Sequence, residues 1–175
     1  MVQANKRSSP SKVITKKSDA APDAIKLLTT DHAEVKAMFK AYQDLVAAEA
    51  EEDERLALAT QICDSLTVHA TVEEEIFYPA AREELEEQDL LDEAEVEHAS
   101  AKDLIAQIQS MEPSEALYDA KVKVLGEYIE HHVKEEEGEL FPKVRKSEVD
   151  LKALGEEMHA RKQELATQLI EQTDK

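Results

Sequence analysis

Two stretches of this 175-residue chain repeat each other and decide its fold: HATVEEEIFYPAAR at residues 69–82 and HVKEEEGELFPKVR at residues 132–145. Both contain His-x-x-x-Glu-Glu, then an aromatic residue followed by Pro, and then Arg. A shorter pair precedes them, DHAEVK at residues 31–36 and EHASAK at residues 97–102. The sequence therefore indicates two related helical hairpins, each carrying one His and then one His-x-x-x-Glu.

Apolar residues recur at steps of three and four through five segments, as on one face of an α-helix. Ala, Glu, Leu and Lys dominate, whereas only 3 Gly and 5 Pro occur, a composition that favours long helices. The predicted helices span about residues 24–48, 53–84, 89–111, 114–145 and 147–172. Because the connections are short, neighbouring helices should be antiparallel. The sequence predicts an all-α fold, an up-down-up-down four-helix bundle with an extra C-terminal helix.

A few residues mark where these helices should begin and end. Ser114 is expected to cap the fourth helix, because a serine hydroxyl accepts a hydrogen bond from a free backbone N–H, and Ser147 precedes the fifth helix. The acidic stretch 49–53 should form the first turn. Pro79 and Pro142 are expected to kink or end the second and fourth helices, since proline has no N–H to donate.

The chain divides into three regions by composition. Residues 1–22 are rich in Lys, Ser and Pro and are predicted to be a disordered basic tail. The bundle is expected over residues 23–146, and a C-terminal amphipathic helix over residues 147–175. Contact of the basic tail with nucleic acid is a minor alternative, because its few positive charges are widely spread.

Charge and cysteine content exclude several classes of protein. The chain has 40 Asp and Glu against 21 Lys and Arg, for a formal net charge of −19. This argues against a general nucleic-acid binder or a binder of anionic membranes, since both need a positive face. The single cysteine, Cys63, excludes an intramolecular disulfide, and we interpret it as a small buried hydrophobe. Without a long apolar run or a secretory signal, we expect a cytoplasmic protein.

Histidines interrupt the apolar faces of the first four helices. Four of the six fall on these faces: His32, His69, His98 and His132. Glu73 and Glu136 follow His69 and His132 by four residues, which places each carboxylate beside an imidazole on one side of a helix. The predicted turns lie about halfway between successive histidines, so the four imidazoles should lie at one level of the bundle. Buried charge is costly unless it is paired or metal-bound, which favours a metal site over a polar core network.

The expected ligands, imidazole and carboxylate without thiolate, suit iron, zinc or manganese. Because two carboxylates are shared among four imidazoles, both should bridge two metals that each hold two His nitrogens. A solvent-derived oxo or hydroxo bridge would leave one position open on each metal, where O2, peroxide or NO could enter. A redox-active metal is favoured over zinc at this point, because zinc alone would have less reason to be paired and bridged by oxo or hydroxo.

The ligand order resembles the hemerythrin-like HHE cation-binding domains. The phrases VHATVEEEIFYP and HHVKEEEGELFP are similar to the two signature helices of that family, and the resemblance covers roughly residues 23–145. It implies a four-helix bundle with a non-haem di-iron centre. The residues that would carry this centre are His32, His69, Glu73, His98, His132 and Glu136. The ferritin-like pattern differs, since it uses Glu-x-x-His and more carboxylates.

Two departures from the oxygen-carrying hemerythrins bear on function. Those proteins have another His four residues after the third one, where this chain has Lys102, and they end with His-x-x-x-x-Asp rather than His132-x-x-x-Glu136. The missing fifth imidazole should leave both metals more open. This favours sensing, iron handling or oxidative-stress defence over reversible O2 carriage. The alternatives are a peroxide-decomposing, catalase-like enzyme, a metal-free interaction module that docks through its last helix, and a histidine-phosphotransfer bundle. No protein partner is indicated.

Several neighbouring residues have two interpretations. His131 could pair with Glu135 in place of His132, but the repeat aligns His132 with His69, so His132 is preferred. Tyr128 lies one turn before His132, where it would either hydrogen-bond a bound ligand or be a core residue. His159 is interpreted as a surface residue. The remaining acidic residues of the two repeats are expected to be solvated or to hold ligand imidazoles from behind: Glu74, Glu75, Glu135 and Glu137.

Overall fold

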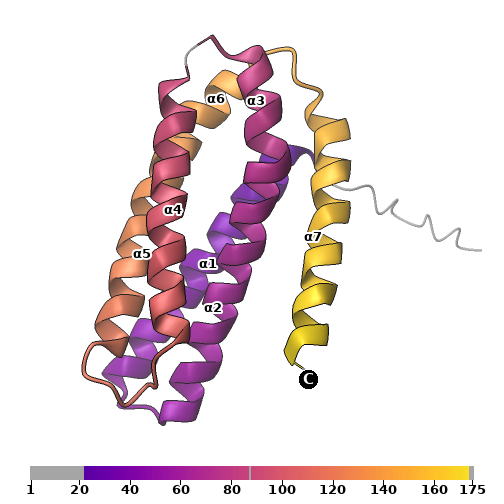
Figure 1. The fold of residues 1–175 in the computed structure, drawn as a ribbon. Helices are drawn as coiled ribbons and strands as arrows, with labels where there is room; N and C mark the ends of the chain where they lie inside the picture. The colour runs from indigo at the N-terminus through magenta and orange to yellow at the C-terminus, as the bar shows by residue number, and fades with distance from the viewer. Residues whose placement is uncertain (1–21, 87, 174–175) are drawn as a thin grey trace, which may run out of the picture.

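The computed structural model describes residues 22–86 and 88–173, and residues 1–21 of the predicted tail lie outside this part of the chain. Four antiparallel helical rods form the bundle, which confirms the predicted fold class (Figure 1). Two of the rods are divided by a π-helical segment. The rods are α1 (Ala24–Ala47); α2, η1 and α3 (Glu52–Val72, Glu73–Phe77, Tyr78–Glu84); α4 (Asp89–Gln109); and α5, η2 and α6 (Tyr118–Glu135, Glu136–Leu140, Phe141–Val144).

The two repeat prolines do not end their helices, contrary to one of the outcomes expected from the sequence. A π turn precedes each proline, and the backbone N–H of Tyr78 bonds to the carbonyl of Glu73, five residues back. The N–H of Phe141 bonds to Glu136 in the same way. The proline then stands in the first turn of the next α-helical segment, where a missing N–H costs little. The helical path continues to Glu84 in one rod and to Val144 in the other.

The predicted serine cap of the fourth helix is wrong. The fourth rod begins at Tyr118 rather than near Ser114, because residues 110–117 form turns, one of which is held by the Glu115 side chain accepting from the Glu112 backbone N–H. The last helix, α7, spans Leu151–Thr173. Its first turn is capped by Asp150, whose carboxylate accepts a hydrogen bond from the backbone N–H of Ala153. An aspartate side chain in this position satisfies one of the free backbone N–H groups at the start of the helix.

The hydrophobic core consists of two separate clusters with a polar layer between them. One cluster lies at the end of the bundle that holds α3 and α6, and includes Leu28, Ala94 and Leu140. The other lies toward the opposite end and includes Val35 and Ala101. Each of the four core histidines stands between apolar residues of the two clusters on its own rod. The bundle therefore encloses the polar layer from both ends.

Helix α7 packs lengthwise along α1 and α2, outside the square of four rods (Figure 1). Gly155 allows the close approach, since a Cβ there would collide with the Pro22 carbonyl oxygen and lie 2.7 Å from the Ala24 nitrogen. Met158 is fully buried in the first core cluster. Arg161 binds both carboxylate oxygens of Glu75, at 2.6 and 3.1 Å. The apolar face of α7 is thus used within this chain. No helix in the described residues is long and apolar enough to cross a bilayer.

Candidate metal centre

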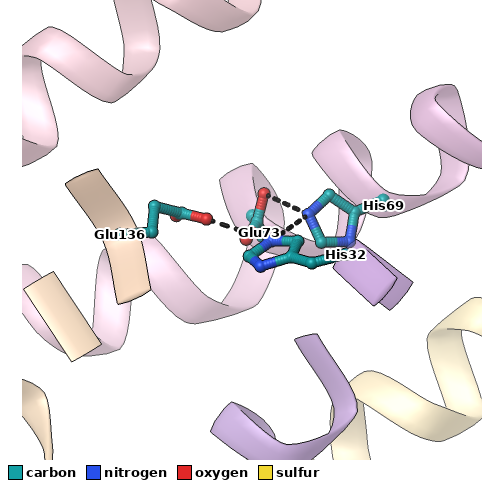
Figure 2. A group of neighbouring side chains, drawn as sticks. All are labelled: His32, His69, Glu73 and Glu136. Atoms are coloured by element: carbon teal, nitrogen blue, oxygen red, sulfur yellow. Dashed lines mark hydrogen bonds and ion pairs between the residues drawn. The ribbon is translucent and has the colours of Figure 1, made fainter. Parts of the chain in front are cut away.

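The six residues expected to bind metal converge in the polar layer, one from each of six helical segments. All are buried, with exposed fractions of 8% or less. Figure 2 shows four of them, with the Glu73 carboxylate near the His69 ring and the Glu136 carboxylate approaching the His32 ring from the opposite side. The six are His32 of α1, His69 of α2, Glu73 of η1, His98 of α4, His132 of α5 and Glu136 of η2.

The imidazoles form two pairs whose Nε2 atoms face each other. The Nε2 atoms of His32 and His69 are 3.2 Å apart, and those of His98 and His132 are 3.1 Å apart. Each glutamate contacts one histidine of each pair. Glu73 Oε2 lies 3.2 Å from His69 and 3.4 Å from His98.

Glu136 completes the same pattern from the other side of the layer. Its Oε2 lies 3.2 Å from His32 Nε2 and 3.4 Å from His132 Nε2. The two carboxylates therefore span the two histidine pairs, which is the arrangement that two bridging ligands require.

A carboxylate stands behind every one of these imidazoles, at the Nδ1 atom. Glu137 is 2.9 Å from His32 Nδ1 and Glu74 is 2.9 Å from His98 Nδ1. These contacts hold the rings in place and favour the Nδ1–H tautomer, which leaves each Nε2 lone pair pointing into the centre. Glu74 and Glu137, which the sequence left as either solvated or imidazole-holding, are thus imidazole partners. Glu75 instead pairs with Arg161.

Two further carboxylates in this role were not anticipated from the sequence. Glu97 is 2.8 Å from His132 Nδ1, and Asp31 is 3.4 Å from His69 Nδ1. Each is the residue immediately before a repeated histidine, and each serves the histidine of the following helix rather than its own neighbour. The signal available in the sequence was the acidic residue that both copies of the short repeat carry at this position.

Tyr78 is the third residue of the centre that was not anticipated from the sequence. Its hydroxyl donates to Glu136 Oε1 at 2.9 Å and lies 3.3 Å from His98 Nε2. The aligned residue in the second repeat is Phe141, whose ring stacks on His32 at 5.7 Å. The centre is therefore symmetric in its ligands but has a hydroxyl on the His98 side only. The sequence predicts that Tyr128 lies inside the bundle, either beside a bound ligand or in the core. In the structure its side chain is 52% exposed.

The buried carboxylates test whether this donor set fits a cation. Both oxygens of Glu73 and Oε2 of Glu136 are buried without a hydrogen-bond partner. Buried polar atoms are nearly always partnered, because an unpaired one loses its bonds to water. Cations between the histidine pairs would give these oxygens and the facing Nε2 atoms the partners that they lack. The residues present therefore fit a site for two metals.

Electrostatics in the layer point the same way. Burial lowers the pKa of His69, but the carboxylates of Glu73 and Asp31 outweigh burial and raise it to about 10. Burial raises the pKa of Glu73, yet the nearby charges of His69 and His98 hold it well below the usual range. Burial and both glutamates raise the pKa of Tyr78, so its hydroxyl keeps its proton. The layer favours positive charge at its centre, supplied by protons where no metal is bound.

Comparison with known proteins places this centre in a family. The model of the hemerythrin HHE cation binding domain matches residues 23–144, the segment that contains all six residues. This chain belongs to the hemerythrin HHE cation-binding domain family. Membership implies that the domain binds cations.

Two relatives of this HHE domain extend the comparison. The crystal structure of a hemerythrin HHE cation binding domain-containing protein from Mycobacterium kansasii has the same fold, with a TM-score of 0.70 and 24% identity. That match covers 85% of this chain and 90% of the other. A protein from Nostoc sp. named DNA nickase is 36% identical over 88 residues, which are 49% of this chain and 24% of the relative. This chain thus spans about a quarter of the length of that relative.

The structure also places the two remaining histidines and Cys63. His131 is 63% exposed and points away from the layer, so His132 is the histidine that joins the other three. His159 is partly exposed on α7, where it accepts a hydrogen bond from Gln163. Cys63 is buried in the second core cluster, and burial raises the pKa of its thiol to about 12.

Lys102 occupies the position where oxygen-carrying hemerythrins are expected to have a further histidine. Its ammonium group binds the Glu74 carboxylate, at 2.7 and 2.5 Å, and that carboxylate holds His98 Nδ1. Lys162 of α7 binds Asp31, which faces His69, in the same manner. Each lysine therefore pairs with a carboxylate that in turn contacts one of the imidazoles. Neither lysine contributes a ligand to the centre.

Proposed function

We propose that this HHE domain binds two iron ions through these six residues and uses them to bind O2, peroxide or NO. The observation that carries the proposal is the convergence of four Nε2 atoms and two carboxylates, three of whose oxygens have no other partner, in one buried layer. His32 and His69 would hold one ion, and His98 and His132 the other. Glu73 and Glu136 would lie between them.

The donor set supports iron, and its surroundings support a reactive site. Imidazole and carboxylate without thiolate suit iron, zinc or manganese, and a paired site open to small molecules favours the redox-active metal. Bound iron would supply Lewis acidity and one-electron redox chemistry toward O2, peroxide or NO. The chain's own part is to orient the imidazoles through their Nδ1 contacts and to exclude bulk water with the two core clusters.

A cavity of about 640 Å³ supports access for a small ligand. It reaches all four core histidines and runs outward between the helices past apolar side chains. Part of its wall comes from the C-terminal half of α7. O2, NO and peroxide are small enough to enter a passage of this size. Residues that line its apolar part are Val35, Leu66, Ala101, Ile105 and Ile129.

The biological use that we propose is sensing, iron handling or oxidative-stress defence. Catalase-like decomposition of peroxide is a second candidate, and one observation favours it. The Tyr78 hydroxyl donates a hydrogen bond to Glu136 and contacts His98, so a hydrogen-bond donor lies within the centre. DNA nicking is not proposed, because only a quarter of the nickase aligns and this chain carries a net charge of −19.

Ligand titration of the iron-loaded protein tests this proposal. We expect absorption in the near ultraviolet that changes on addition of azide and of NO, because both can reach the centre through the cavity. A peroxide-decay assay on the same sample separates the two candidates, since an enzyme turns over many equivalents and a sensor reacts with few. A spectrum that neither azide nor NO alters would mean that the metals are closed to ligands and serve structure alone.

A further inference from the structure

A second cluster of metal-ligating side chains lies on the surface beside the candidate centre. His131 and Glu135 stand one turn apart on α5, and Glu97 faces them from α4. His131 Nε2 is 3.3 Å from Glu135 Oε1 and 3.5 Å from Glu97 Oε1. One ligand atom from each of the three lies within 4.8 Å of the others. The imidazole is 63% exposed, so the cluster is open to ions in solution.

The spacing of these atoms suits a tetrahedral cation. In zinc sites the metal–nitrogen and metal–oxygen distances are about 2.0–2.2 Å, which places neighbouring ligands of a tetrahedron about 3.3–3.6 Å apart. The two measured separations, 3.3 and 3.5 Å, lie in that range. One histidine and two carboxylates also form a donor set that zinc and iron accept, with a fourth position left for water.

The same glutamate links this surface cluster to the buried layer. Glu97 Oε2 is 2.8 Å from His132 Nδ1, while Oε1 of the same carboxylate faces His131. A cavity of about 250 Å³ has His98, His131 and His132 in its wall. A cation held at the surface cluster would therefore be next to the His98 and His132 half of the centre, with a passage leading toward it.

The pseudo-twofold repeat shows that this feature belongs to one half of the molecule. Asp31 aligns with Glu97, but its partner on the outer side is the Lys162 ammonium group. Val68 and Val72, both buried, occupy the positions that align with His131 and Glu135. In the described part of the chain, the ion-pair partners of Glu97 are two histidines and no lysine or arginine. Asp31 is thus already paired with a lysine ammonium group, whereas Glu97 lies beside two further potential metal ligands, His131 and Glu135.

We propose that Glu97, His131 and Glu135 form an outer site that binds a divalent cation and delivers it to the buried centre. Ferrous iron is the cation that this role implies, so the delivery step rests on the proposed function of the centre. Binding at the surface does not, because the three ligands are complete without the buried residues. With this outer site, the cation would enter the buried centre from the side of His98 and His132.

Two measurements test the outer site, with zinc as the probe for binding. In protein whose centre is already loaded with iron, Zn²⁺ should shift the imidazole resonances of His131 and saturate at one ion per chain. Glu135→Gln should weaken this binding by about tenfold or more, since one of three ligands loses its charge. His159 on α7 is the internal control, and its resonances should not follow the same titration. A His131 signal that responds no more strongly than that of His159 would overturn the site.

The delivery step is tested by the rate at which metal-free protein takes up Fe²⁺. His131→Ala should slow loading several-fold and leave the final iron content unchanged, because it removes the capture site and none of the six buried residues. His159→Ala is the matched control and should load at the wild-type rate. Equal rates for both variants would overturn the delivery step. If the buried centre takes up neither iron nor zinc, the zinc titration of His131 in the metal-free protein still decides whether the outer site exists.

Discussion

Replacing Glu73 with Gln is expected to reduce the iron content from two ions per chain to less than one. The Glu73 carboxylate contacts a histidine of each pair, and both of its oxygens are buried without another partner. Glutamine keeps the shape of the side chain but removes its charge and turns one acceptor into a donor. In the proposed centre a single neutral substitution would therefore disrupt both metal positions together, which loss of a ligand to one metal would not do.

The thermal response to metal should disappear in the same variant. A ligand present at 1,000 times its dissociation constant stabilises the native state by about 4 kcal/mol. For a domain of this size that corresponds to a rise in Tm of about 8–16 °C. Wild-type protein should show this rise when iron is added, and Glu73→Gln should show almost none. Glu139→Gln is the matched control, since Glu139 is exposed in η2 and loses the same charge. A full rise in Tm for Glu73→Gln would show that Glu73 is not a ligand.

Replacing Gly155 with Leu is expected to lower the stability of the whole domain by about 3 kcal/mol, the upper part of the range for overpacking. A side chain at position 155 would meet the backbone of Pro22 and Ala24, which cannot move aside as a flexible side chain can. Helix α7 must then separate from the start of α1, which exposes Met158 and strains the ion pair between Lys162 and Asp31. Thermal unfolding measures the change, at about 2–4 °C in Tm per kcal/mol.

The same variant should also weaken metal binding at the His69 side. Asp31 lies between Lys162 and His69, so movement of α7 loosens a carboxylate that orients a ligand imidazole. Losses of this kind typically cost about 10–100-fold in metal affinity. Gly138→Ala is the control for adding a side chain, because a Cβ there would meet nothing within 4 Å. If Gly155→Leu unfolds at the wild-type temperature, the close contact between α7 and α1 is not part of the folded state.

The fold and the convergence of the six residues could be predicted because two independent patterns agreed. The position of the histidines on apolar helix faces predicts that their side chains point into the bundle. The repeated His-x-x-x-Glu, together with the position of the turns, predicts that these side chains lie at one level along the bundle axis. Neither pattern depends on details of the backbone. This is why His132 could be preferred over its neighbour His131, and the structure places His132 in the layer and His131 on the surface.

The role of Tyr78 could not be predicted because the backbone departs from the α-helical period where it matters. In a regular α-helix Phe77 and Tyr78 point about 100° apart, so the two side chains would not both be expected to face the core. The π turn over residues 73–77 inserts one extra residue, and both side chains are buried. Such insertions have no simple sequence signal, although the proline after each one marks where a regular helix would be disturbed.

The position of α7 could not be predicted for a different reason. It has no counterpart in the repeat, so nothing in the sequence indicates which helices it covers. Its contacts include the close approach at Gly155, the burial of Met158, and the ion pairs of Arg161 with Glu75 and of Lys162 with Asp31. The sequence therefore left open whether this helix packs on the bundle or docks on another protein.

The metal content of the purified protein tests the central claim most directly. Elemental analysis of folded, full-length protein expressed with sufficient iron should find two iron ions per chain, and Glu139→Gln should contain the same number. Folded protein that contains no bound metal, or whose metal content is the same in Glu73→Gln as in the wild type, would contradict the account.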